Sequence, residues 1–297
     1  MKSKRAIATL LIGDYHTRLW KDYCEANWKQ YADKHGYDLV CLEGALDTSE
    51  RAQKRHPSWQ KCLILSQDYA AKYERVVWID SDIIINVAKA PDVAEGVPLE
   101  KIGVTDYWEQ PVPHLYRECL ARMYEFWGEG AVVNYDPPQY YKNYPFDQAF
   151  DRVAGNMVMV LSPQHHRKFL EHNYYAYEDR GPAWLAEMRP FSYELIKDGI
   201  DHWIDHRFNM NWWELRFLFY PFLLQQPLVS GYPARIRRKL VQWMGGDSFE
   251  DIKRACIHTT FLNGYFFHFG GDTKEDMRLL DTSITSWKQC TLAPGHL

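Results

Sequence analysis

Several features that would place this 297-residue chain in a particular class are missing from it. No apolar run approaches the about 20 residues that a membrane-spanning helix requires. The six cysteines form no Cys-x-x-Cys pair, so they predict buried free thiols in a reducing compartment and no disulfide framework. The basic start and short apolar run lack a small-residue cleavage site before Asp14, so no signal peptide is expected. We therefore expect a cytoplasmic protein without an integral membrane segment.

Charge and glycine patterns exclude further classes. A net charge of −4, with both signs well mixed, provides no electrostatic footprint for nucleic acid. The glycine-rich dinucleotide fingerprint and the phosphate-loop motif are both absent, so a phosphate held here would need a metal ion instead. Aromatic residues, in contrast, make up 15% of the chain. We expect most of them to pack in the core and a minority to line a cleft.

The most informative stretch is a short apolar run broken by two carboxylates. Residues 75–79 are rich in β-branched side chains, Asp80 and Asp82 follow, and three isoleucines come next. A spacing of two places both carboxylates on one face of a strand, where burying them unpaired would be costly. If the strand ends near Ile79, Asp80-Ser81-Asp82 lie at its carboxyl edge and can bind a divalent cation. The alternative is an acidic turn without a ligand, since Asp is common in turns.

The N-terminal part of the chain alternates between strand and helix patterns. Strands are expected over 6–12, 37–42 and 76–79, and helices over 17–34, capped by Gly36, and over 59–72. This alternation predicts a parallel sheet, and ligands bind at the carboxyl ends of the strands in such sheets. Gly13-Asp14-Tyr15, which follow the first strand, should therefore lie on the same edge as the acidic pair.

The later sequence is less regular. Further strands are expected over 101–105, 154–161, 255–259 and 266–269, and further helices over 162–175 and 191–200. Residues 107–145 are rich in Pro, Tyr and Trp, which predicts an irregular functional segment around a short helix at 116–126. Residues 214–250 show no clear pattern. No repeat or linker divides the chain.

Four motifs, taken in order, resemble a known family. They are Asn27-x-Lys29-x-Tyr31-Ala32-x-x-His35-Gly36-Tyr37, His56-Pro-Ser-Trp59-x-Lys61, Val77-Trp-Ile-Asp-Ser-Asp-Ile-Ile84 and Phe266-Phe-His-Phe-Gly-Gly-Asp-Thr-Lys274. Together they resemble the metal-dependent nucleotide-sugar glycosyltransferases of GT-A fold. The galactosyltransferase and xyloglucan xylosyltransferase group is the closest, and the glycogenin-like enzymes are more distant. The likeness covers residues 6–87, 154–161, 194 and 266–274, but the Pro-Trp that follows the lysine in glycogenin-like enzymes is absent.

The resemblance implies a single GT-A-like (Rossmann-like) α/β domain with a mostly parallel central sheet flanked by helices. We expect it to cover residues 1–285, with a nucleotide-binding part at about 1–105, an acceptor part at about 106–285 and a tail over 286–297. Segments 107–145 and 180–220 would form an aromatic-lined acceptor cleft. The implied reaction moves a hexose or pentose from a nucleoside diphosphate sugar, with UDP expected, to a hydroxyl of a carbohydrate or glycoconjugate. Mn²⁺ or Mg²⁺ would be the cofactor, and retention of anomeric configuration is implied.

The resemblance also indicates the metal ligands. Asp80 and Asp82 match the acidic motif, and the family has a late His-Phe segment whose histidine completes the metal site, here His268. An imidazole beside two carboxylates suits Mn²⁺ better than a purely oxygen-lined site would. His258 is the competing third ligand, and a structural histidine on an aromatic strand is the ordinary alternative.

The residues expected around the donor sugar nucleotide come from the same motifs. Gly270 and Gly271 would let the backbone approach the diphosphate, and Lys274 would pair with its charge. The other expected contacts to the donor are Gly13, Asp14, Tyr15, Lys61, Asp80 and Ser81. Any of these lysines or acids could equally be an ordinary solvated side chain.

Two residues are expected beside the reacting sugar. Asn156 opens a strand that faces the sugar in the family, and Glu194 matches the place beneath the anomeric carbon. There Glu194 would stabilise an oxocarbenium-like sugar or, as the less favoured option, attack it. A surface helix Glu is the alternative. Weaker candidates for the same role are Asp147, Gln148, Asp201 and Asp205.

Other functions stay open at this point. A nucleotidyltransferase acting on sugar phosphates could use the same metal and sheet, but usually has a Gly- and Arg-rich loop that residues 13–18 lack. A haloacid-dehalogenase-like phosphatase also has two Asp at this spacing, but on its first strand. A non-catalytic carbohydrate-binding protein would explain the aromatic residues and leave the acidic pair unexplained.

Overall fold

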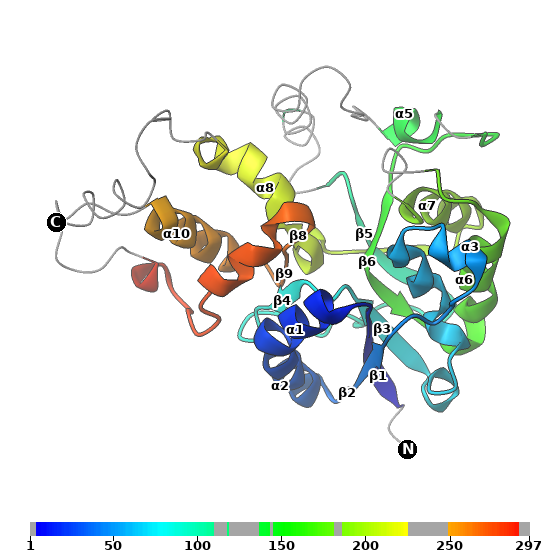
Figure 1. Ribbon diagram of the computed structural model, residues 1–297, viewed down its shortest axis with the longest axis horizontal. Helices are drawn as coiled ribbons and strands as arrows, with labels where there is room; N and C mark the ends of the chain where they lie inside the picture. The colour runs from blue at the N-terminus through cyan, green and yellow to red at the C-terminus, as the bar shows by residue number, and fades with distance from the viewer. Residues whose placement is uncertain are drawn as a thin grey trace.

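The computed structural model of the chain describes residues 4–109, 118, 137–142, 145–180, 186–224 and 249–290. Its main sheet has six strands in the order β2-β1-β3-β6-β5-β7 (Figure 1). These are β1 (Arg5–Leu11), β2 (Asp38–Glu43), β3 (Arg75–Ile79), β5 (Ile102–Asp106), β6 (Ala154–Leu161) and β7 (Asp201–Ile204). Neighbouring strands are parallel, except that β6 is antiparallel to both β3 and β5. The expected α/β class with a mostly parallel central sheet is confirmed.

Alternate side chains of the main sheet contribute to two cores. Val77 packs on one face, in a core with the tryptophans of α1 (Asp14–Tyr23) and α2 (Glu25–His35). Val76 and Trp78 pack on the other face, in a core with η1 (Pro57–Ser66), α6 (Pro163–Ala176) and α7 (Met188–Lys197). Because successive strand residues point to opposite faces, a sheet covered on both sides needs strands that are apolar throughout, as β3 is.

A second sheet of three strands follows the acidic pair in the order β4-β9-β8. Its strands are β4 (Ile83–Ile85), β8 (Met210–Asn211) and β9 (Phe266–His268). Figure 1 shows this sheet between the main sheet and the later helices α8 (Trp212–Phe219) and α10 (Phe249–Phe261). The remaining described elements are α3 (Glu50–Gln53), η2 (Ala70–Lys72), α5 (Pro137–Lys142), η4 (His206–Asn209), η5 (Pro221–Leu223), η6 (Gly271–Leu279) and η7 (Trp287–Gln289).

The structure changes three of the expected elements. The helix expected over 17–34 is two helices broken at Cys24, although Gly36 does end the second in a left-handed conformation. The helix expected over 59–72 is 3₁₀ helix in η1 and η2. The strand expected over 255–259 is wrong, because these residues lie in α10, where Ile257 and Phe261 pack into the core one turn apart. The helix expected at 116–126 falls outside the described residues, apart from residue 118.

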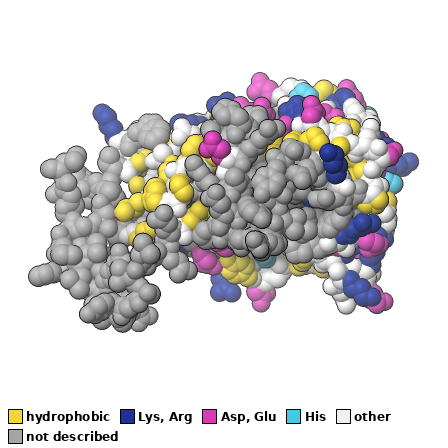
Figure 2. All heavy atoms as spheres, turned by 90° about the horizontal axis from the view of Figure 1, so that it is seen from above, with side chains coloured by type: hydrophobic (Ala, Val, Ile, Leu, Met, Phe, Trp, Pro, Cys, Tyr) yellow, Lys and Arg dark blue, Asp and Glu magenta, His cyan; other side chains and the backbone are white. Residues whose placement is uncertain are grey.

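Other composition-based expectations can be compared with the described residues. Within them, Cys24, Cys41, Cys62, Cys256 and Cys290 are all free thiols. Several tryptophans and tyrosines are among the largest fully buried side chains, as expected for a core rich in aromatic residues. Figure 2 shows basic and acidic side chains interspersed over the described part of the visible surface. No helix of the described part has both the length and the apolar character needed to cross a membrane.

Asn27 ties α2 to β4 and leads to a stability prediction. Its side-chain amide donates to the carbonyl of Ile85 at 2.8 Å and accepts from the N–H of the same residue at 2.7 Å. Asn27→Leu removes both bonds from buried backbone groups, so the free energy of unfolding should fall by about 2 to 4 kcal/mol. Chemical denaturation measures the change. Gln30→Leu, at an exposed position of the same helix, is the control and should shift it by less than about 0.5 kcal/mol.

Candidate active site

The acidic pair lies where the chain passes from the main sheet to the second sheet. β3 ends at Ile79, and the N–H of Asp80 donates to the carbonyl of Met157 on β6 at 2.9 Å. The N–H of Ile83 then donates to the carbonyl of Asp80 at 3.2 Å, which closes a turn before β4. The prediction that the strand ends near Ile79 is confirmed. Both carboxylates therefore lie at the carboxyl edge of the main sheet.

Strand pairing in the second sheet brings His268 to Asp82. Ile83 pairs with His268 in antiparallel register, and the N–H of Phe269 donates to the carbonyl of Asp82 at 2.9 Å. His268 Nε2 lies 3.2 Å from Asp82 Oδ1. One ligand atom each of Asp80, Asp82 and His268 lies within 4.8 Å of the other two. Among the described residues, this is the only group of three or more such side chains that could hold a metal ion.

A second contact orients the His268 ring. His268 Nδ1 lies 3.1 Å from Asn209 Oδ1, an oxygen that accepts hydrogen bonds, and this contact favours the tautomer with a proton on Nδ1. Nε2, which faces Asp82, is then the nitrogen that would offer its lone pair to a cation bound there. A ring held by its other nitrogen in this way is the usual arrangement of a histidine that binds a metal. Two carboxylates and this imidazole fit a divalent cation such as Mn²⁺.

Two lysines compensate the charge of the carboxylates. Lys274 Nζ lies 3.0 Å from Asp82 Oδ2, and Lys61 Nζ lies 2.9 Å from Asp80 Oδ1. Burial alone would raise the pKa of Asp82, but His268 and Lys274 outweigh it and hold that pKa well below its usual range. Burial raises the pKa of Asp80 against the effect of Lys61, and the Asp82 carboxylate adds to this rise. A cation between the two acids would relieve their mutual repulsion.

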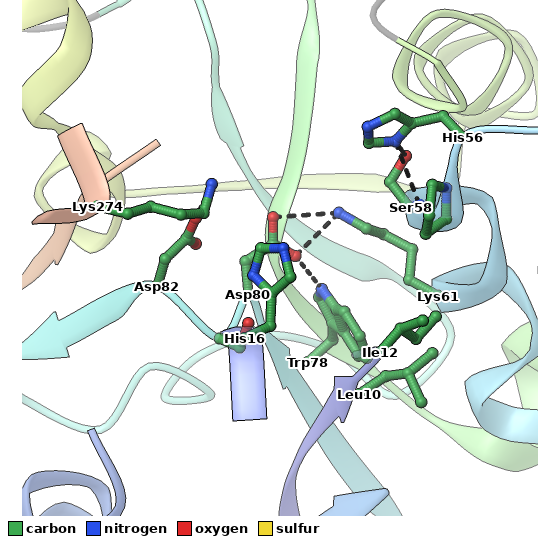
Figure 3. A pocket seen from close by; sticks show the side chains of 12 residues that line it. Leu10, Ile12, His16, His56, Ser58, Lys61, Trp78, Asp80, Asp82 and Lys274 are labelled. Carbon is green, nitrogen blue, oxygen red and sulfur yellow. Dashed lines mark hydrogen bonds and ion pairs between the residues drawn. The ribbon is translucent and has the colours of Figure 1, made fainter. Parts of the chain in front are cut away.

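The acidic pair faces a cavity with two lobes. The first lobe, of about 270 Å³, extends to the end of β1 and is also lined by Leu10, Ile12 and His16. The second lobe, of about 710 Å³, extends toward β6 and the start of α7 and is also lined by Tyr107, Asn156, Glu187 and Trp213. Six residues line both lobes: His56, Ser58, Lys61, Asp80, Asp82 and Lys274. Figure 3 shows Lys61 reaching toward Asp80, with Lys274 beside Asp82.

Glycines carry the chain past the acidic pair after β9. Gly271 has a φ of +60°, and a Cβ there would lie 3.2 Å from the Trp213 indole. A Cβ on Gly270 would lie 3.4 Å from His268 Nε2. A larger residue at Gly271 would therefore strain the backbone and press on Trp213, and one at Gly270 would fill the space beside the imidazole. The path leads directly into η6, whose first turn carries Lys274 to the carboxylates.

Most residues expected at the site do line the cavity. Ser81 lines the first lobe, and Asn156, His268, Gly270 and Gly271 line the second. The residues that line both lobes include Lys61, Asp80, Asp82 and Lys274. Gly13, Asp14 and Tyr15 are not among the described lining residues, but His16, the next residue, is. The Tyr15 hydroxyl donates to Glu275 at 2.9 Å.

Two expected residues lie elsewhere. Glu194 accepts a hydrogen bond from the Tyr177 hydroxyl, lies 3.8 Å from Lys197 and is not among the described residues lining either lobe. His258, the alternative metal ligand, sits in α10, where its Nε2 accepts from the N–H of Asp281 at 3.1 Å.

Glu187 is a residue of the site that no sequence pattern indicated. This carboxylate lines the second lobe and lies 3.2 Å from the Lys61 ammonium. It belongs to none of the motifs, and no spacing or periodicity distinguishes it from a surface glutamate. Only the folded chain places it next to Lys61.

No protein-family model matches this chain, and no curated protein matches it. Solved structures of glycosyltransferases are similar to it. A glycosyltransferase involved in the glycosylation of the major capsid of PBCV-1 is 13% identical, with a TM-score of 0.48, over 93% of this chain and 100% of that chain. The bifunctional glycosyltransferase WbbM is 10% identical, with a TM-score of 0.48, over 97% of this chain and 51% of that chain. Mouse xyloside xylosyltransferase 1 is 11% identical, with a TM-score of 0.40, over 91% of this chain and 99% of that chain.

Proposed function

We propose that this chain is a metal-dependent glycosyltransferase. It would move a sugar from a nucleoside diphosphate sugar, with UDP as the expected nucleotide, to a hydroxyl of a carbohydrate or glycoconjugate. One observation carries the proposal: Asp80, Asp82 and His268 converge within 4.8 Å of one another. They do so beside Lys274, at the carboxyl edge of a mostly parallel sheet, and between two lobes of a cavity.

The chain's own groups suit a diphosphate in this place. The bound cation, Mn²⁺ or Mg²⁺, would supply Lewis acidity and neutralise charge on the leaving nucleotide. Lys274, at the first turn of η6, would donate to the diphosphate oxygens. Gly270 and Gly271 would let the backbone approach the same oxygens. These roles need no phosphate loop, which agrees with the absence of that motif.

The two lobes suggest where the parts of the substrates would lie. The first lobe adjoins the end of β1, the edge at which nucleotides bind in parallel sheets, so we assign it to the nucleoside. The second lobe combines Trp213 and Met188 with polar groups such as Asn156, a mixture that suits a sugar and its acceptor. The predicted place of Asn156 beside the sugar is consistent with this. The contacts of Glu194 do not support its predicted role, and retention rests on the family resemblance alone.

Calorimetry with nucleotides tests the proposal. UDP, ADP and GDP are titrated into the protein with and without Mn²⁺, and we expect UDP to bind only when the metal is present. Absence of metal-dependent binding for every nucleoside diphosphate would refute the proposal. A screen of nucleotide sugars for metal-dependent donor hydrolysis then identifies the donor. Release of pyrophosphate from a nucleoside triphosphate and a sugar phosphate would indicate a nucleotidyltransferase instead.

A further inference from the structure

Two carboxylates, the half-buried Asp80 and the buried Glu187, share one ammonium at the junction of the lobes. Lys61 Nζ lies 2.9 Å from Asp80 Oδ1 and 3.2 Å from Glu187 Oε1. The side chains of Lys61 and Glu187 are only 6% and 4% exposed. Glu187 also accepts hydrogen bonds from Asn156 Nδ2, at 3.1 Å, and from the Ser58 hydroxyl. Contacts with Lys61, Asn156 and Ser58 therefore fix the position of the Glu187 carboxylate.

The charges determine how this arrangement behaves. A lysine side chain is a cation at neutral pH, and both carboxylates lie within hydrogen-bonding distance of the Lys61 ammonium. A divalent cation on Asp80 would compete with this ammonium for the same carboxylate and would repel it. Glu187 offers Lys61 a second partner that the divalent cation does not occupy.

We propose that Glu187 is a positioning residue that sets the cation affinity of the Asp80 site through Lys61. When the cation binds Asp80, Lys61 stays paired with Glu187 and gives up its contact with Asp80. Without the Glu187 charge, Lys61 pairs with Asp80 alone and opposes the cation. This role of Glu187 rests on the metal site of the proposed function. Glu187 itself would bind neither the cation nor the side-chain atoms that hold the cation.

Calorimetric titration with MnCl₂ alone tests the proposal, with no nucleotide and no turnover. Glu187→Gln keeps the shape of the side chain and should weaken Mn²⁺ binding by about fivefold or more. Lys61→Met should strengthen binding, because it removes the competing ammonium. In the Lys61→Met background, Glu187→Gln should change the affinity by less than about twofold, since its effect acts through Lys61.

A matched control separates this effect from loss of negative charge in general. Asp179 also lines the second lobe, and its carboxylate accepts from the N–H of His56 at 2.7 Å. Asp179→Asn should leave Mn²⁺ affinity within about twofold of the wild type. An equal loss in Asp179→Asn and Glu187→Gln would overturn the proposal.

The remaining outcomes are also decisive. Wild-type affinity in Glu187→Gln, or an equally large effect of that change in the Lys61→Met background, would overturn the proposal. If Glu187→Gln does not fold, the Mn²⁺ affinity of Lys61→Met is compared with that of the double variant. Similar affinities support the proposal, and different affinities refute it. A wild-type protein that binds no Mn²⁺ would refute the metal site itself, and with it the proposed function.

Discussion

Replacing Asp82 by Asn should lower the affinity for Mn²⁺ by more than about a hundredfold and abolish metal-dependent nucleotide binding. Substitutions in the outer shell of a metal site already cost about 10- to 100-fold, so the loss of a charged ligand should exceed them. Removing the Asp82 charge also leaves the Lys274 ammonium without its carboxylate partner, and this ammonium would repel a divalent cation more strongly. Calorimetry with Mn²⁺, and then with UDP and Mn²⁺ together, measures both effects.

Asn has nearly the shape of Asp, so the fold should be retained. A thermal unfolding transition close to that of the wild type is the check on this point. Asp33→Asn, at an exposed position on α2, removes a carboxylate far from the site and should leave Mn²⁺ binding within about twofold. A folded Asp82→Asn protein that binds Mn²⁺ as tightly as the wild type would refute the metal site.

His268→Ala should remove most of the Mn²⁺ affinity, by about tenfold or more, whereas His258→Ala should retain it. The physical reason is that Nε2 of His268 faces Asp82, while Nε2 of His258 is engaged by the N–H of Asp281 in another part of the fold. The pair is well matched, since both histidines are buried, with 6% and 7% exposure. Mn²⁺ titration of the two variants compares them directly.

Free imidazole provides a second measurement on the same variants. Added to His268→Ala, it should enter the space left by the side chain and restore part of the Mn²⁺ binding, and it should have no effect on His258→Ala. The reverse pattern, with binding lost only in His258→Ala, would make His258 the third ligand. Thermal unfolding of both proteins shows whether any loss comes from the fold.

Local patterns predicted several parts of the fold correctly. The apolar residues of β3 followed by Asp80 and Asp82 were sufficient to place a strand end at Ile79, because burying those charges within a strand would be costly. Gly36 was identifiable as a helix end because only a residue tolerant of positive φ fits there easily. Both signals lie within a few residues of the structure they specify.

Other parts depend on contacts that no local pattern contains. The break at Cys24 lies where its thiol packs against the carbonyls of Ser81 and Ile83, which are distant in sequence. Residues 255–259 carry β-branched side chains that favour a strand, yet they continue a helix whose apolar face is buried in the core. In each case tertiary packing outweighs the local preference.

The sequence by itself predicted an acidic pair at the edge of a sheet built from alternating strands and helices, and the family resemblance implied that a late histidine and lysine belong with it. Only the tertiary structure decided which histidine meets the pair, because pairing of β4 with β9 sets His268 opposite Ile83, next to Asp82. The tertiary structure also makes β6 antiparallel to β3 and brings Glu187 to within 3.2 Å of the Lys61 ammonium. Strand register and buried charge contacts join segments far apart in the chain, and periodicity within one segment contains no information about its distant partner.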